Sequence, residues 1–110
     1  MTAPQITSQF IDAAIDAAFR ATIDKRAIVM DEVIDKVSAK MGVSAEDITG
    51  PSHKSKHVRP RWIAMWACRQ QGIPYAVIGE HFGGRDHRTV MHAVKKMDAQ
   101  VERIKWQNMT

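Results

Sequence analysis

The clearest chemical signal in this chain is a group of hydrogen-bond donors that follows a pair of glycines, Gly83-Gly84. His87, Arg88 and Thr89 come first. His92 follows Arg88 by four residues, and Lys95 and Lys96 follow His92 by three and four, the spacing of one helix face. Side chains of these types donate to base edges and to phosphate oxygens. The pattern predicts a surface that contacts nucleic acid.

A second basic group occupies residues 53–61, with the sequence HKSKHVRPR. It holds four cations, Lys54, Lys56, Arg59 and Arg61, and has no apolar periodicity, which is typical of a loop. Arg59 precedes a proline and is pushed toward extended geometry, while Pro60 suits the first position of a helix. We therefore expect a basic loop that ends where a helix begins at Pro60.

Charge is divided unevenly along the 110 residues. Residues 1–50 carry 5 Lys or Arg against 8 Asp or Glu, a balance of −3, and residues 51–110 carry 11 against 4, a balance of +7. All five histidines also lie in the second part. This division indicates that the C-terminal portion faces a polyanion.

Catalytic and metal chemistry are not expected. His53 and His57 lie four residues apart in the predicted loop, His87 and His92 lie five apart, and neither pair has an obvious third ligand. No nucleophile motif such as GxSxG occurs, so we expect no enzyme activity and no cofactor. The single cysteine, Cys68, allows no internal disulfide and is predicted to be a small residue of the core.

Apolar periodicity predicts an all-α fold that would position these groups. Helices are expected over residues 8–28, over about 29–41 with Gly42 as the stop, and over a short turn that Ser44 opens and Gly50-Pro51 ends. Further helices are expected over about 60–70, over 74–82 and, with Asp86 as the cap, from residue 87 to about 106. We expect a helical extension over residues 1–28 and a DNA-binding domain over 29–110.

The extension has an apolar face that needs a partner. The residues on it are Phe10, Ile11, Ala14, Ile15, Ala18, Phe19 and Ile23. The long last helix also has apolar residues near its end, Val101 and Ile104. We expect the extension to cover that end within the same chain, in preference to forming a dimer.

Two motifs carry a family resemblance. The segment from Gly83 to Ala93 has the pattern GGRDHxTVxHA, and Arg59-Pro60-Arg61 is followed by Ile63-Ala64-Met65. Together they resemble the C-terminal DNA-binding domain of the bacterial replication initiator DnaA, over about residues 33–96. The resemblance implies a helical bundle of the TrpR-like superfamily, in which a short helix, a glycine turn and a long helix form a helix-turn-helix.

The resemblance also implies a partner, double-stranded DNA, with the long helix in the major groove and the basic loop at the backbone and minor groove. The implied contact residues are Lys54, Lys56, Arg59, Arg61, Arg85, Asp86, His87, Arg88, Thr89, His92 and Lys96. Among them Asp86 is expected to cap the helix and to hold Arg85.

This sequence departs from the family pattern at three points. Arg88 stands where the family usually has threonine, and arginine prefers the O6 and N7 atoms of guanine. The loop before Arg59 is poorer in arginine than the family's, which weakens the case for insertion into the minor groove. Trp62 replaces a residue that is often polar.

The leading hypothesis is a sequence-specific DNA-binding protein that recognises a DnaA-box-like site and regulates replication initiation or transcription. The sequence has no GxxxxGK[ST] phosphate loop, so no ATPase activity is expected. Two alternatives stay open: an adaptor in which the helix-turn-helix has lost specific DNA reading and residues 8–28 bind a partner protein or a second copy, and a binder of RNA or single strands. No apolar run could span a bilayer and Met1–Gln5 has no signal-peptide character, so the expected location is the cytoplasm, on the nucleoid.

Overall fold

A computed structural model describes residues 8–22 and 25–108 and shows six α-helices. They are α1 (Ser8–Thr22), α2 (Lys25–Met41), α3 (Ala45–Thr49), α4 (Ser55–Gln70), α5 (Tyr75–His81) and α6 (His87–Asn108). The described residues contain no strand, which confirms the all-α prediction. No helix among them is both long enough and apolar enough to cross a membrane.

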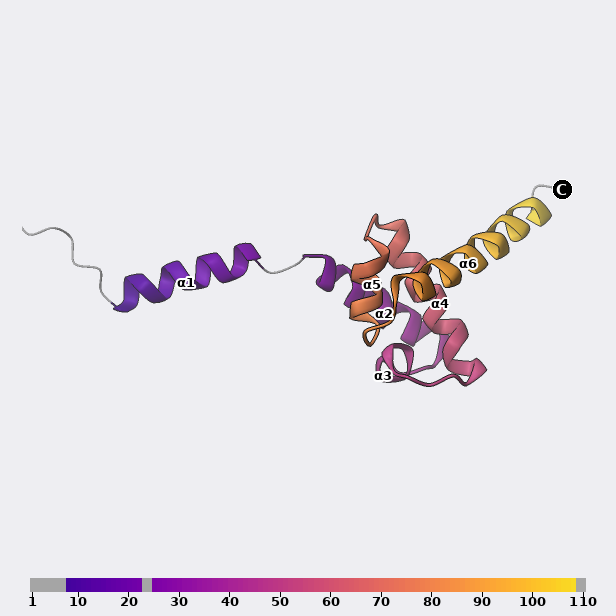
Figure 1. The fold of residues 1–110 in the computed structure, drawn as a ribbon, viewed down its shortest axis with the longest axis horizontal. Coiled ribbons are helices and arrows are strands. Elements are labelled where there is room, and N and C mark those ends of the chain that lie inside the picture. The colour runs from indigo at the N-terminus through magenta and orange to yellow at the C-terminus, as the bar shows by residue number, and fades with distance from the viewer. Residues whose placement is uncertain (1–7, 23–24, 109–110) are drawn as a thin grey trace, which may run out of the picture.

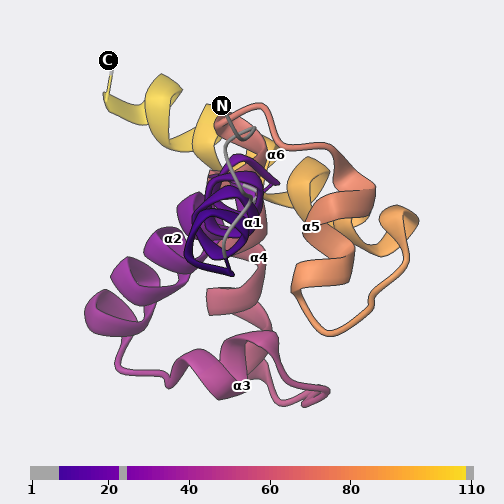
Figure 2. The ribbon, with the colours of Figure 1, turned by 90° about the vertical axis from the view of Figure 1, so that its left-hand side faces the viewer.

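The core lies where α2, α4, α5 and α6 meet, with α4 in contact with each of the other three (Figure 2). Apolar side chains spaced three or four residues apart on each helix face this centre, as their periodicity predicts. The largest fully buried ones are Met30, Ile48, Met65, Ile78, Phe82 and Val90. This packing fixes the direction of α6 relative to the start of α4, the two segments that carry the exposed cations predicted to contact DNA.

Turn residues end the helices where the sequence predicts. Gly42, with a φ of 67°, follows α2 in the left-handed region that glycine adopts most readily. The Ser44 hydroxyl accepts a hydrogen bond of 3.1 Å from the backbone N–H of Asp47 and so caps α3. These stops leave the segment from Gly50 to Lys54 as the connection into α4.

The predicted loop over residues 53–61 is wrong for most of its length, because α4 begins at Ser55 rather than at Pro60. Pro60 is therefore the sixth residue of the helix, where its missing N–H leaves one backbone bond unmade. It is fully buried, and its neighbours His57 and Arg61 are buried as well. We attribute the longer helix to these tertiary contacts, which offset the local preference of Arg59-Pro60 for an extended chain.

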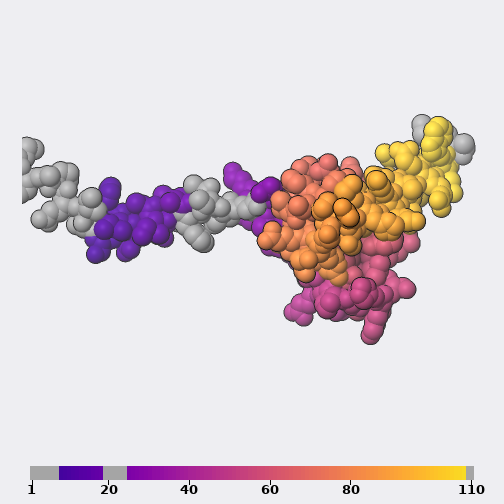
Figure 3. Space-filling model, viewed as in Figure 1, coloured from indigo at the N-terminus to yellow at the C-terminus, as the bar shows by residue number. Residues whose placement is uncertain are grey.

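The expected contact between the extension and the end of α6 is absent. Figure 1 shows α1 and the free end of α6 on opposite sides of the bundle, and Figure 3 shows both standing out from it. Ile104 and Trp106 are 55% and 67% exposed, so nothing described covers this end. Among the other predicted positions, Ile23, Met1–Gln5 and the side chain of Phe19 lie outside the described residues. The second helix begins at Lys25, ahead of the division expected after residue 28.

Candidate nucleic-acid interface

A tight turn joins α5 to α6 and aims the start of α6 outward. Gly83 and Gly84 have φ values of 83° and 73°, and the N–H of Arg85 donates to the carbonyl oxygen of Gly79 at 2.7 Å. A Cβ atom on Gly79 would collide with the carbonyl oxygen of Arg85. The close approach of the turn to α5 therefore requires glycine at position 79.

Asp86 caps α6, as expected from the sequence. Its Oδ1 accepts a hydrogen bond of 2.8 Å from the backbone N–H of Arg88 and lies 3.2 Å from Nδ1 of His87. The carboxylate thus satisfies one of the free N–H groups of the first turn and orients the His87 ring. The further suggestion that Asp86 holds Arg85 is not confirmed, because Arg85 bonds to backbone carbonyls instead.

The outer face of α6 carries the donors that the sequence singled out. Val90, Ala93, Val94 and Met97 turn toward the core, so the opposite face looks into solvent. The exposed residues on it are His87, Arg88, Thr89, His92, Lys95 and Lys96. Arg88, His92 and Lys96 follow one another at four-residue steps and form one line along the helix. This is a row of polar and cationic groups some two turns long, a form suited to a DNA groove.

The start of α4 supplies a second set of exposed cations. Lys54, the residue before α4, is exposed, and so are Lys56 and Arg59 in its first turns. They lie beside α6, because the ring of Trp62 on α4 meets that of His92 edge-on at a centroid distance of 5.9 Å. The structure thus brings the basic segment at the start of α4 and the donor row of α6 to adjoining surfaces.

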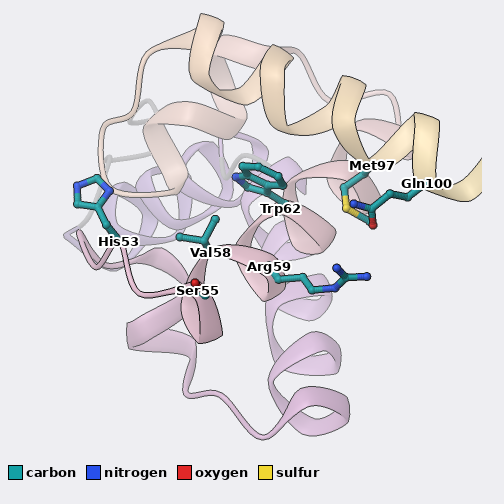
Figure 4. Close-up of a pocket in the computed structure, with 7 residues that line it drawn as sticks. All are labelled: His53, Ser55, Val58, Arg59, Trp62, Met97 and Gln100. Atoms are coloured by element: carbon teal, nitrogen blue, oxygen red, sulfur yellow. The ribbon is translucent and has the colours of Figure 1, made fainter.

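A hollow of about 330 Å³ lies between these two helices (Figure 4). It is lined by side chains from the approach to α4, from α4 itself and from α6: His53, Ser55, Val58, Arg59, Trp62, Met97 and Gln100. Gln100 was not predicted as a site residue, since no sequence pattern links it to Arg59. The lining is partly apolar and partly polar.

Arg61 is placed differently from the other cations in the predicted contact set. It is only 4% exposed, and its guanidinium donates to three backbone carbonyls, those of Ile48 at 2.6 Å, Ser52 at 2.8 Å and Asp47 at 2.9 Å. Burial lowers the pKa of Arg61 below its ordinary value, and the nearby charge of Arg85 lowers it further. The side chain holds the α3–α4 connection instead of facing solvent.

Arg85 holds the same connection from the other side. Its guanidinium donates to the carbonyl oxygens of Thr49 at 3.2 Å, of Gly50 and of Phe82. The side chain is half-buried, and this burial lowers the pKa of Arg85. The two arginines therefore converge from α4 and from the helix-turn-helix onto residues 47–52, and their donors point inward.

The histidines do not form a metal centre in the described part of the chain, where no group of three metal-binding side chains occurs. His57 is buried; its Nδ1 lies 2.8 Å from Oγ of Ser52 and its Nε2 lies 3.4 Å from Oδ2 of Asp47. His81 pairs with Asp31 at 2.8 Å and joins α5 to α2. Both contacts link elements of the bundle, a role that sequence spacing did not reveal.

Known proteins match this chain through the same elements. The family model described as bacterial dnaA protein helix-turn-helix matches residues 30–97. The chromosomal replication initiator protein DnaA of Ruegeria pomeroyi is 42% identical over 77 residues, which cover 67% of this chain and 16% of the relative. That of Xanthobacter autotrophicus is 35% identical over 104 residues, 92% of this chain and 20% of the relative. No solved structure matches.

These matches also correct one expectation. The resemblance was expected over about residues 33–96, yet the Xanthobacter match takes in 92% of the chain and so includes part of α1. The DnaA of Thermomicrobium roseum matches similarly, at 34% identity over 88% of this chain and 22% of its own length. The chain spans about a fifth of the length of these relatives or less. With residues 30–97 matched by the family model, it belongs to the bacterial DnaA helix-turn-helix family.

Proposed function

We propose that this chain binds double-stranded DNA in a sequence-specific manner, reads a site similar to a DnaA box, and regulates replication initiation or transcription. The observation that carries the proposal is the row of exposed donors on α6. Helix α6 is the second helix of the helix-turn-helix, and the row lies beside the cations of α4. Membership in the DnaA helix-turn-helix family supports it.

In this proposal the first turn of α6 enters the major groove. His87, Arg88 and Thr89 project from the start of the helix, where the side chains of a recognition helix reach base edges. Arg88 would donate to guanine, and the methyl group of Thr89 would contact a thymine methyl. Arg88 therefore favours a site that differs at one position from the one a threonine would read.

Phosphate contacts would come from two segments, α6 itself and the start of α4. His92, Lys95 and Lys96 lie further along α6, and Lys54, Lys56 and Arg59 lie at the start of α4. Contacts of this kind fix register and supply affinity without sequence information. Arg61, Arg85 and Asp86 would act indirectly, by holding the two segments that touch DNA.

The proposed role is binding without ATPase activity, in the cytoplasm and on the nucleoid. The portion of the curated relatives that this chain matches is 16–22% of their length, and the family model assigns it to the helix-turn-helix. Binding of this kind would regulate by occupying sites, for example in competition with a full initiator.

Fluorescence anisotropy tests the proposal. The purified chain is titrated against a duplex with a DnaA box and a scrambled duplex, each at several salt concentrations. We expect tighter binding to the box by more than about tenfold, with a log–log salt slope near −4 to −6, the value for roughly 5–7 phosphate contacts. Equal affinity for both duplexes would reject box recognition. Binding to neither duplex would reject DNA binding and favour the adaptor hypothesis.

A further inference from the structure

The apolar stripe that packs α6 onto the bundle continues beyond the bundle. Val90, Val94 and Met97 are buried, Val101 is half-buried, and Ile104 continues the same four- and three-residue steps with 55% of its surface exposed. Since residues at these steps share one helix face, Ile104 presents to solvent the face that is half-buried one turn earlier and buried two turns earlier. An apolar helix face that extends beyond the bundle in this way is suited to packing against a partner protein.

Basic side chains border this face. Arg103 and Lys105 are exposed and adjoin Ile104 in sequence, so each lies about 100° from it, on opposite sides of the helix axis. Glu102 lies about 160° away, on the far side of the helix. A hollow of about 290 Å³ runs beside Ile104 and is lined by Arg59, Gln100, Arg103 and Ile104. We call these four residues with Lys105 the α6 groove.

The complementary surface lies on α1. Ile11 and Ile15 are one turn apart and are 45% and 59% exposed. Asp12 and Asp16 each follow one of these isoleucines, so both acids lie along the same side of the apolar pair, and both are exposed. α1 therefore presents an apolar line with an acidic border, and the α6 groove presents an apolar residue with basic borders.

Connectivity favours α1 of a second copy over α1 of the same chain. Helix α1 ends at Thr22 and α2 begins at Lys25, so the three Cα–Cα steps that join them span about 11 Å at most. The start of α2 lies on the side of the bundle away from the free end of α6 (Figure 1). Pairing of α1 with another α1 would place acidic borders near each other, which like charges oppose. Exchange of α1 between two copies covers both apolar surfaces and closes by two-fold symmetry.

We infer that two copies of this chain form a reciprocal dimer in which α1 of each packs into the α6 groove of the other. The first measurement is sedimentation equilibrium of the full-length chain without DNA, from about 1 to 200 µM, because the dimer fraction follows mass action. We expect the mean mass to rise from 12.4 kDa toward twice that value. A mass that stays at 12.4 kDa throughout this range would overturn the inference.

Charge reversal then identifies the surfaces. One variant carries Asp12→Lys and Asp16→Lys, and the other carries Arg103→Glu and Lys105→Glu. Each alone should weaken dimerisation by about tenfold or more, because every contact then pairs like charges. An equimolar mixture should dimerise like the parent chain, since each reversed α1 then meets a reversed groove. Circular dichroism checks that both variants keep their helices.

A matched control reverses two acids elsewhere. Glu32→Lys with Asp35→Lys changes two exposed residues of α2 and alters the net charge as much as the first variant does. This control should dimerise like the parent chain. A dimer that is indifferent to both reversals, or variants that stay monomeric when mixed, would overturn the inference, because a contact between two chains must be restored by mixing.

Discussion

The Nε–H of Arg61 donates to the carbonyl oxygen of Ile48 at 2.6 Å, and this bond fastens the first half of α4 to the end of α3. Both residues are buried, so the bond forms in a region of low dielectric, where a lost partner is costly. Together with the bonds from Arg61 to Ser52 and Asp47, it fixes the connection that leads to the exposed cations of α4.

Arg61→Met should therefore destabilise the fold. The change removes three hydrogen bonds and leaves their carbonyl acceptors without a donor, and we expect the free energy of unfolding to fall by about 3 kcal/mol or more. Urea denaturation followed by circular dichroism measures it. Arg59→Met, two residues earlier and exposed, is the matched control and should change stability by less than about 0.5 kcal/mol. Equal stability losses in the two variants would contradict the assigned role of Arg61.

Gly79→Ala should destabilise the chain although it lies in a helix. Alanine is favoured over glycine in a helix by about 1 kcal/mol, so an unconstrained position would gain stability. Here the added Cβ meets the carbonyl oxygen of Arg85, and the turn must move away. We expect a loss of about 1–3 kcal/mol, read from thermal unfolding. Glu80→Ala, at the next and exposed position of α5, should be close to neutral; a gain in Gly79→Ala would show that the turn is free to shift.

His87→Ala and Lys96→Ala should separate base reading from backbone contact. Loss of His87 should cost roughly 1–3 kcal/mol on the preferred duplex and much less on a scrambled one, so specificity falls. Loss of Lys96 should weaken binding to both duplexes alike and reduce the salt slope by about 1. Anisotropy titrations at several salt concentrations measure both quantities. Lys36→Ala, an exposed residue of α2, serves as the control. Equal losses on both duplexes for His87→Ala would exclude a role in sequence reading.

Cys68 should resist thiol reagents while the chain is folded. The side chain is fully buried, and this burial raises the pKa of its thiol to about 12. Because the thiolate is the reactive form, a chromogenic disulfide reagent at pH 8 should react only after denaturant is added.

The same shift has a consequence for stability. Above about pH 9 the unfolded thiol ionises while the buried one stays protonated, so the unfolded state binds fewer protons. The parent chain should then lose stability relative to Cys68→Ala as pH rises from 8 to 10, by up to about 1.4 kcal/mol per pH unit. Urea titrations of both proteins at each pH measure this difference in the free energy of unfolding. A difference that stayed constant from pH 8 to 10 would contradict the raised pKa of Cys68.

Local sequence predicted the features that local chemistry controls. The stop at Gly42, the cap at Ser44, the glycine turn and the Asp86 cap all depend on residues within four positions of one another, and all are present. The donors on α6 were likewise predicted, from residue type, spacing and the family resemblance, and they are exposed because the opposite face is apolar at regular steps. The contact roles of these donors stay predictions.

Long-range contacts account for what the sequence did not reveal. The first turn of α4 forms despite Arg59-Pro60, and His57 and Arg61 are buried there by partners in residues 47–52. A pair of arginines in a basic segment looks like two solvent-exposed cations, and only the three-dimensional packing distinguishes Arg59 from Arg61. The predicted position of α1 was also wrong. An apolar helix face indicates that it packs against another surface, but it does not indicate which one.

Arg61 and Arg85 point inward and hold the fold, whereas Arg88 points into solvent. This difference affects how the proposed DNA site can change. Arg61 and Arg85 bind backbone carbonyls, so the frame they build is indifferent to the side chains of the residues they hold. Apart from His92, whose ring meets that of Trp62, Arg88 and its exposed neighbours on α6 take no part in that frame beyond the Asp86 cap. Substitutions along the outer row can therefore accumulate at little cost in folding, and a lineage carrying this domain can acquire a new binding site without rebuilding the scaffold.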